Sequence, residues 1–180
     1  GQPLTFAILS GNEAGIFHLA SDTGDLHVAD AAQLDFETEP THHLVVQVSD
    51  GANVASATIT VELQNANDNA PLVGDMLFSI DETAAVGSVV GQMSATDADG
   101  DALTWEVVAL HRSGDLPFAI DENGQLSVSQ ALDFELVESY AFGVRVSDGA
   151  FTDEALVLVN VMPQNDNAPT IEDAGWTISE

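Results

Sequence analysis

Side chains with oxygen donors recur along this sequence in four short motifs, LDFE, DADGD, VSDG and NDNAP. All but DADGD occur twice, and each lies at the end of a predicted strand. A single copy of VSDG or NDNAP is an ordinary turn sequence, because Asp and Asn bond to nearby backbone and Pro ends a strand. Several such motifs in register indicate ligands for a hard cation, since Ca²⁺ prefers carboxylate, amide and carbonyl oxygens.

The charge of the chain favours the same partner. Its 180 residues include 30 Asp and Glu but only two Lys and Arg, which gives a formal net charge of -28. Such a charge repels phosphate backbones and anionic membranes and attracts divalent cations. We therefore expect calcium ions and no nucleic acid among the partners. The longest apolar runs, such as residues 155–159, are far too short to span a bilayer, so we expect no membrane insertion by this chain.

The sequence repeats with a period close to one domain length. Residues 34–51 align with residues 132–149, and Pro71 and Pro169 stand at the same offset of 98 positions. A period this long indicates tandem domains rather than a solenoid of short repeats. We predict an incomplete repeat at residues 1–70 that lacks its N-terminal strands, a complete repeat at 71–168, and the first strand of a further repeat at 169–180.

Seven short β-rich runs, bounded by Gly, Asp, Asn or Pro, fill the complete repeat. They cover residues 75–81, 88–96, 103–109, 117–120, 125–129, 138–147 and 153–162. In one run Tyr140, Phe142, Val144 and Val146 share a face, and its counterpart places His42, Leu44, Val46 and Val48 inward. We therefore predict an all-β fold of tandem seven-stranded Greek-key, immunoglobulin-like β-sandwiches.

Two features of the predicted sandwiches concern their turns and edges. Gly24 and Gly124 offer a left-handed residue for a hairpin turn in each repeat. The first repeat has no counterpart of residues 83–99, and a sandwich without one of its strands leaves backbone groups unpaired. We predict that another chain, or the tail 170–180 of a neighbour, fills this gap by strand exchange.

The motifs LDFE, DAD, VSDG and NDNAP, in this order and spacing, resemble the calcium motifs of tandem cadherin repeats. The resemblance covers nearly the whole chain and implies that calcium ions stiffen each junction between repeats. Two positions depart from the family pattern, because Asn65 and Pro163 stand where the family usually has Asp. This departure predicts a weak or absent middle ion.

The resemblance also implies a set of metal ligands. Glu82, Asp133, Glu135 and Asp166 would form the first-ion cluster of the second junction. Asn67, the Asn69 carbonyl, Asp97, Asp99 and Asp148 would form the third-ion cluster of the first junction, with Glu37, Asp68 and Asp99 around its middle ion. The predicted ligands also include Asp35, Asn165 and Asn167. Asp50 stands at a ligand position of its motif, but this sequence offers no further ligands for the same ion.

Other site chemistries find less support. An EF-hand loop starting at Asp97 fails, because Ala102 replaces the sixth-position Gly and Val108 the twelfth-position Glu. His18 and His27 flank a predicted hairpin turn, where an opposite pair is more often surface or packing histidine than a transition-metal site. The sequence contains no G-x-S-x-G motif, H-E-x-x-H motif or phosphate loop, so we predict that this chain is not an enzyme.

These observations predict a calcium-rigidified tandem adhesion module of a secreted or cell-surface protein. Its partners would be other copies of the same protein, bound through homophilic contacts, or another surface protein. A calcium-dependent carbohydrate-binding module, with a polysaccharide as its partner, is the alternative. The absence of Lys, the acidity and the lack of N-x-S/T sequons favour a bacterial parent.

Overall fold

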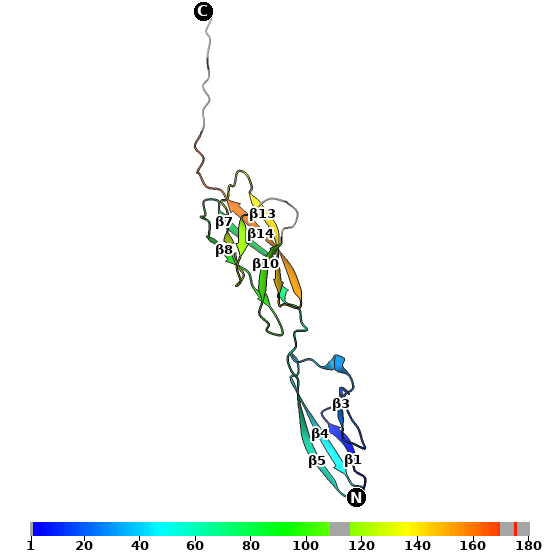
Figure 1. Cartoon of the computed structure of the whole chain (residues 1–180). Coiled ribbons are helices and arrows are strands. Elements are labelled where there is room, and N and C mark those ends of the chain that lie inside the picture. The colour runs from blue at the N-terminus through cyan, green and yellow to red at the C-terminus, as the bar shows by residue number, and fades with distance from the viewer. Residues whose placement is uncertain (1, 109–115, 170–174, 176–180) are drawn as a thin grey trace, which may run out of the picture. The chain divides into compact units, whose positions relative to one another are not determined.

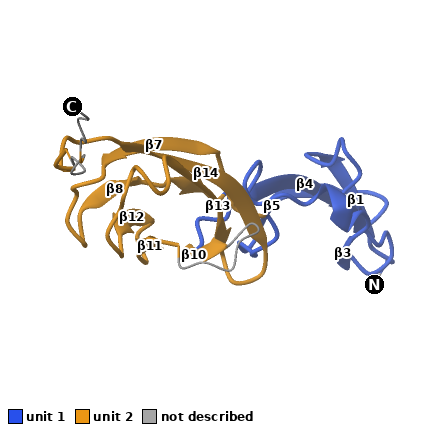
Figure 2. Cartoon of the chain, turned by 90° about the horizontal axis from the view of Figure 1, so that it is seen from above, with its two compact units in different colours: residues 1–69, 98–101 blue, residues 70–97, 102–180 orange. Residues whose placement is uncertain are grey.

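The computed structural model describes residues 2–108, 116–169 and 175, and these form two compact units. Unit 1 comprises Gly1–Asn69 with Ala98–Asp101, and unit 2 comprises Ala70–Asp97 with Ala102–Glu180 (Figure 2). The regular elements of the described residues are β-strands, with one 3₁₀ turn, η1 (Ala31–Gln33), and no α-helix. The predicted all-β sandwich fold is therefore confirmed. The predicted strand at 169–180 falls largely outside the described residues.

Unit 2 contains two main sheets and a short strand pair (Figure 1). The four-stranded sheet has the order β10 (Thr104–Val108), β13 (Ser139–Ser147), β14 (Thr152–Met162), β7 (Met76–Asp81). The three-stranded sheet has the order β11 (Phe118–Ile120), β12 (Gln125–Val128), β8 (Val89–Gln92), and β6 (Leu72–Val73) pairs with β9 (Ala95–Thr96). All neighbours are antiparallel except β14 and β7, which are parallel.

The core of unit 2 lies between its two main sheets. Phe142, Val144 and Val146 of β13 are buried on one face, as their alternation predicts, while Tyr140 is half-buried. Phe142 stacks on Phe118 of the other sheet with ring centroids 5.7 Å apart. The predicted strand at 88–96 is divided into β8 and β9 by a buried methionine, Met93.

Unit 1 has the same layout with fewer strands. One sheet has the order β1 (Thr5–Ser10), β4 (Thr41–Ser49), β5 (Val54–Glu62), and the other pairs β2 (Phe17–Leu19) with β3 (Leu26–Val28). His42 and Leu44 of β4 are buried as predicted, but Val46 and Val48 are only half-buried. The core is correspondingly small, with Ile16, Phe17 and Leu44 at its centre.

Equivalent residues of the two units differ in solvent exposure, because the sheets of unit 1 have fewer described strands than those of unit 2. Val28 of β3 is 51% exposed, whereas Val128, at the matching position of β12, is 1% exposed. The difference arises because β12 pairs with β8 on its second edge, and no described strand of unit 1 pairs with β3 in that way. Likewise β5 pairs only with β4, while its counterpart β14 pairs with both β13 and β7.

The hairpin turns adopt the backbone conformation that the sequence predicts. Gly24 and Gly124 have φ angles of 77° and 79°. A Cβ atom at Gly24 would lie 3.0 Å from the Phe6 ring, and one at Gly124 would lie 2.9 Å from the Trp105 ring. Glycine therefore satisfies both the turn and the close packing of an aromatic ring over it.

Candidate metal centres

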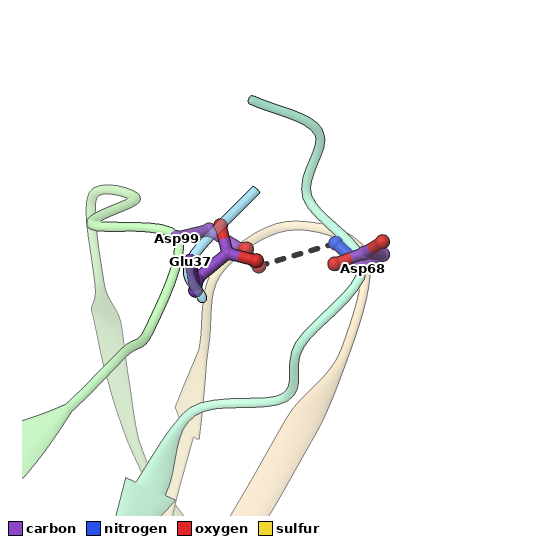
Figure 3. Close-up of side chains that lie close together, drawn as sticks. All are labelled: Glu37, Asp68 and Asp99. Carbon is purple, nitrogen blue, oxygen red and sulfur yellow. Dashed lines mark hydrogen bonds between the residues drawn. The ribbon is translucent and has the colours of Figure 1, made fainter. Parts of the chain in front are cut away.

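Three carboxylates converge at one end of unit 1. Glu37 follows η1, Asp68 follows β5, and Asp99 belongs to residues 98–101, which group with unit 1 by their contacts. Their carboxylate oxygens lie within 4.8 Å of one another. Figure 3 shows these side chains meeting from three separate loops. The first centre is therefore built from the LDFE, NDNAP and DADGD motifs together.

The backbone of NDNAP fixes the Asp99 carboxylate. Its Oδ2 accepts the N–H groups of Asp68 at 3.1 Å and Asn69 at 2.8 Å, and the first of these bonds is drawn in Figure 3. The Asn69 amide also donates to Asp99 Oδ1 and to Asp68 Oδ1, both at 2.9 Å. It lies 3.4 Å from Glu37 Oε2 as well, so one amide contacts all three acids.

In this centre a hydrogen bond favours the ionised form of one carboxylate, while neighbouring negative charges oppose the ionisation of another. The hydrogen bond from the Asn69 side chain lowers the pKa of Asp99. Burial raises the pKa of Glu37, and the nearby charges of Asp99 and Asp68 raise it further. Like charges at this spacing repel one another. A divalent cation would remove this repulsion.

A second centre lies in unit 2, where Glu82, Glu135 and Asp166 have carboxylate oxygens within 4.8 Å of one another. Glu82 follows β7 and is 5% exposed. Its Oε2 accepts the N–H of Phe134 at 2.8 Å, and its Oε1 accepts the N–H of Gln164 at 2.5 Å. These backbone bonds, that from Gln164 first, lower the pKa of Glu82 and hold it as a carboxylate.

The two centres share equivalent residues. Glu37 matches Glu135, and Asp68 matches Asp166, at the offset of 98 positions. Asp99 completes the first group and Glu82 the second. The two groups therefore show the same Glu and Asp pair with a different third carboxylate.

The DADGD loop forms a third group, in which Asp97, Asp99 and Asp101 occupy alternate positions of one short segment. Their carboxylate oxygens also lie within 4.8 Å of one another. Asp101 is absent from the predicted ligands. Its place in an Asp-x-Asp-x-Asp pattern is the signal that identifies it.

Other predicted ligands lie in local turns. The Asp35 carboxylate accepts the N–H of Thr38 at 3.0 Å and its hydroxyl at 2.6 Å, and the hydroxyl bond lowers the pKa of Asp35 most. Asp133 Oδ1 accepts the N–H of Leu136 at 3.0 Å. Neither residue is in the carboxylate groups found among the described residues.

The VSDG aspartates also organise turns. Asp148 Oδ1 accepts the N–H groups of Ala150 at 2.7 Å and Phe151 at 2.6 Å. Asp50 Oδ1 accepts the matching bonds from Ala52 at 2.9 Å and Asn53 at 2.7 Å, and the bond from Asn53 is the main cause of its lowered pKa. The turn interpretation of VSDG is thus part of the structure, and metal ligation by Asp148 stays a prediction.

The NDN asparagines flank the acids of both centres. Asn67 and Asn69 lie on either side of Asp68, and Asn165 and Asn167 on either side of Asp166. Asn167 donates to Asp166 Oδ1 at 3.0 Å, as Asn69 does to Asp68. The carboxylates of each centre offer oxygen ligands from irregular loops, which suit Ca²⁺ better than the stricter octahedron of Mg²⁺.

Comparison with known protein families identifies the chain. The Cadherin domain model matches residues 2–64 and 76–162. The chain belongs to the cadherin family. The resemblance predicted from the motifs is confirmed, and it places the chain among extracellular, adhesion-type modules.

Several cadherins are similar to this chain along nearly its whole length. It is 37% identical over 185 residues to human cadherin EGF LAG seven-pass G-type receptor 2, an alignment that covers 96% of this chain and 6% of the receptor. It is 35% identical to cadherin-4 of Caenorhabditis elegans, over 99% of this chain and 4% of that protein. Protocadherin-16 of Rattus norvegicus is 33% identical, over 94% of this chain and 5% of its own length. The chain thus spans a small part of these relatives, and as animal proteins they give no support to a bacterial parent.

Solved cadherin structures share the fold. Human protocadherin-24 EC1-2 has a TM-score of 0.74 and 27% identity, covering 91% of this chain and 84% of that one. Mouse cadherin-23 EC22-24 has a TM-score of 0.74 and 26% identity, covering 91% of this chain and 55% of that one. In the part of this cadherin chain that the structure describes, no helix is long and apolar enough to cross a membrane.

Proposed function

We propose that this cadherin chain is a calcium-rigidified tandem adhesion module of a secreted or cell-surface protein. The observation that supports the proposal is the convergence of Glu37, Asp68 and Asp99 from three loops. Three oxygen-ligand carboxylates at this spacing repel one another until a cation binds. Because residues 98–101 connect β9 to β10 of unit 2, an ion that holds Asp99 to Glu37 and Asp68 would restrain one unit against the other.

The proposed ligands follow the predicted clusters. Glu37, Asp68 and Asp99 would bind the middle ion of the first junction, and Glu82, Asp133, Glu135 and Asp166 the first ion of the second. The middle ion would be weak, because Asn65 replaces a carboxylate and its amide donates to the Asp99 carbonyl at 2.7 Å. The remaining predicted ligands, Asp35, Asn67, Asn69, Asp97, Asp148, Asn165 and Asn167, belong to the same proposal.

Removing one shared carboxylate tests the calcium assignment. We expect Asp99→Ala to weaken calcium binding at the first junction by about tenfold or more, because Asp99 belongs to two of the carboxylate groups. Isothermal titration of dialysed protein with Ca²⁺ measures the effect. Asp22→Ala, a change at an exposed turn residue, is the control and should leave the affinity unchanged. Equal affinities in Asp99→Ala and wild type would show that the assignment is wrong.

Membership in the cadherin family favours adhesion over the carbohydrate-binding alternative. We propose homophilic contact, with a different surface protein as the other kind of partner. Beads coated with the chain should aggregate in Ca²⁺ and disperse in chelator, and Asp99→Ala beads should aggregate less. Aggregation that persists in chelator, or binding to a glycan array in place of aggregation, would argue against this function.

We further propose that unit 1 accepts a strand from another segment. A cavity of about 160 Å³ is lined by Leu34, Phe36, Glu37, Leu63, Gln64, Ala66 and Asp68. In unit 2 the Glu82 side chain bonds to the N–H groups of Phe134 and Gln164, and the matching residues of unit 1, Phe36 and Ala66, line this cavity. It therefore suits a glutamate at the end of a strand added parallel to β5. The tail 170–180, predicted to donate such a strand, lies outside the described residues except at residue 175.

A further inference from the structure

The small sheet of unit 1 presents two histidines opposite each other. In this antiparallel pair His18 of β2 lies opposite His27 of β3, between the pairs Phe17 with Val28 and Leu19 with Leu26. Phe17 and Leu19 are buried, whereas both histidines are exposed. Since successive side chains of a strand point to opposite faces, the two imidazoles project from the solvent face of the sheet.

The hydrogen-bond pattern sets the spacing of the two histidines. Two residues along the ladder, the N–H of Ala20 donates to the Asp25 carbonyl at 2.9 Å. His18 and His27 therefore occupy the same type of hydrogen-bonded pair, in which opposite Cα atoms lie about 5.5 Å apart. At this separation one nitrogen of each imidazole can reach a shared metal ion at the usual bond length of about 2.0–2.1 Å.

We propose that His18 and His27 form a two-histidine site for a divalent transition-metal ion such as Ni²⁺, Cu²⁺ or Zn²⁺. Imidazole nitrogen suits these ions, while Ca²⁺ takes oxygen ligands, so this site and the carboxylate centres select different cations. The net charge of -28 raises the local concentration of any divalent cation. Water completes the coordination, and the bound ion joins β2 to β3. Because only neutral imidazole binds metal, acid releases the ion.

Titration with Ni²⁺ tests the site. Tag-free protein is held in excess Ca²⁺, so that Ni²⁺ does not compete for free carboxylates, and Ni²⁺ binding is measured by calorimetry. His18→Ala and His27→Ala should each weaken binding by about tenfold or more. His43→Ala is the matched control, because His43 is an exposed strand histidine whose ring lies 3.2 Å from Thr60 Oγ1. Circular dichroism checks that each variant is folded.

Unit 2 offers the converse experiment. Ala119 of β11 lies opposite Ser127 of β12, in the register that His18 and His27 have in unit 1. The double variant Ala119→His/Ser127→His should bind a second equivalent of Ni²⁺. The proposal is overturned if wild type takes up no more Ni²⁺ than the double variant His18→Ala/His27→Ala, if His43→Ala loses as much affinity, or if the unit 2 pair adds no uptake.

Discussion

At the scale of single residues, each carboxylate centre depends on the donors that orient its acids as much as on the acids. The LDFE and NDNAP motifs predict that Glu135 and Asp166 meet Glu82, and the structure brings these three together. The sequence could not predict that backbone N–H groups hold Glu82, because these bonds depend on how two distant loops pack. For the same reason it could not predict that Asp133 also bonds to its own turn.

The lowered pKa of Glu82 predicts a pH dependence of stability. A folded-state pKa below the ordinary value of 4.5 means that ionised Glu82 stabilises the folded state fully above that value, and this stabilisation is lost as the pH falls through the lower folded pKa. Glu82→Gln should lower the melting temperature at neutral pH in chelator, because an amide cannot accept at both former oxygen positions. The difference from wild type should close in acid. A difference that does not narrow as the pH falls progressively below 4.5 would contradict this role.

At the scale of elements, the period-two alternation and the turn residues predict most strands and both glycine turns. The predicted run 138–147 corresponds to β13, and the run 153–162 to β14. The sequence could not predict the division of residues 88–96 into β8 and β9, because this division depends on the burial of Met93 in the core. The sequence also could not predict which strand edges stay open, because this depends on strand pairing. β14 pairs with β7 on its second edge, whereas no described strand pairs with the second edge of β5.

The open edge of β5 predicts strand binding in trans. A labelled peptide with the sequence of residues 173–180, DAGWTISE, matches residues 75–82, which comprise Asp75, β7 and Glu82. We expect this peptide to bind the chain, measured by fluorescence anisotropy. A peptide carrying Glu180→Gln should bind less tightly, because the matching Glu82 of unit 2 accepts the backbone N–H groups of Phe134 and Gln164. No binding would contradict the open edge, and equal binding of both peptides would contradict the glutamate cavity.

At the scale of the whole molecule, the repeat of motifs predicts the family, and comparison with known cadherins confirms it. The charge of -28 and the absence of cysteine predict that ions rather than disulfides stabilise the chain. The composition favours a bacterial parent, a prediction to which the animal relatives named above give no support. Composition reflects solubility and salt adaptation, so it is a weak guide to ancestry.

Calcium is proposed to restrain the two units against each other, and distances between spin labels test this restraint most directly. The chain has no cysteine, so Ser56→Cys and Ser129→Cys place one label on an exposed residue of each unit. Pulsed electron paramagnetic resonance should give a narrow distance distribution in Ca²⁺ and a broad one in chelator, with Asp99→Ala staying broader than wild type in Ca²⁺. The same distribution with and without Ca²⁺ would contradict the account.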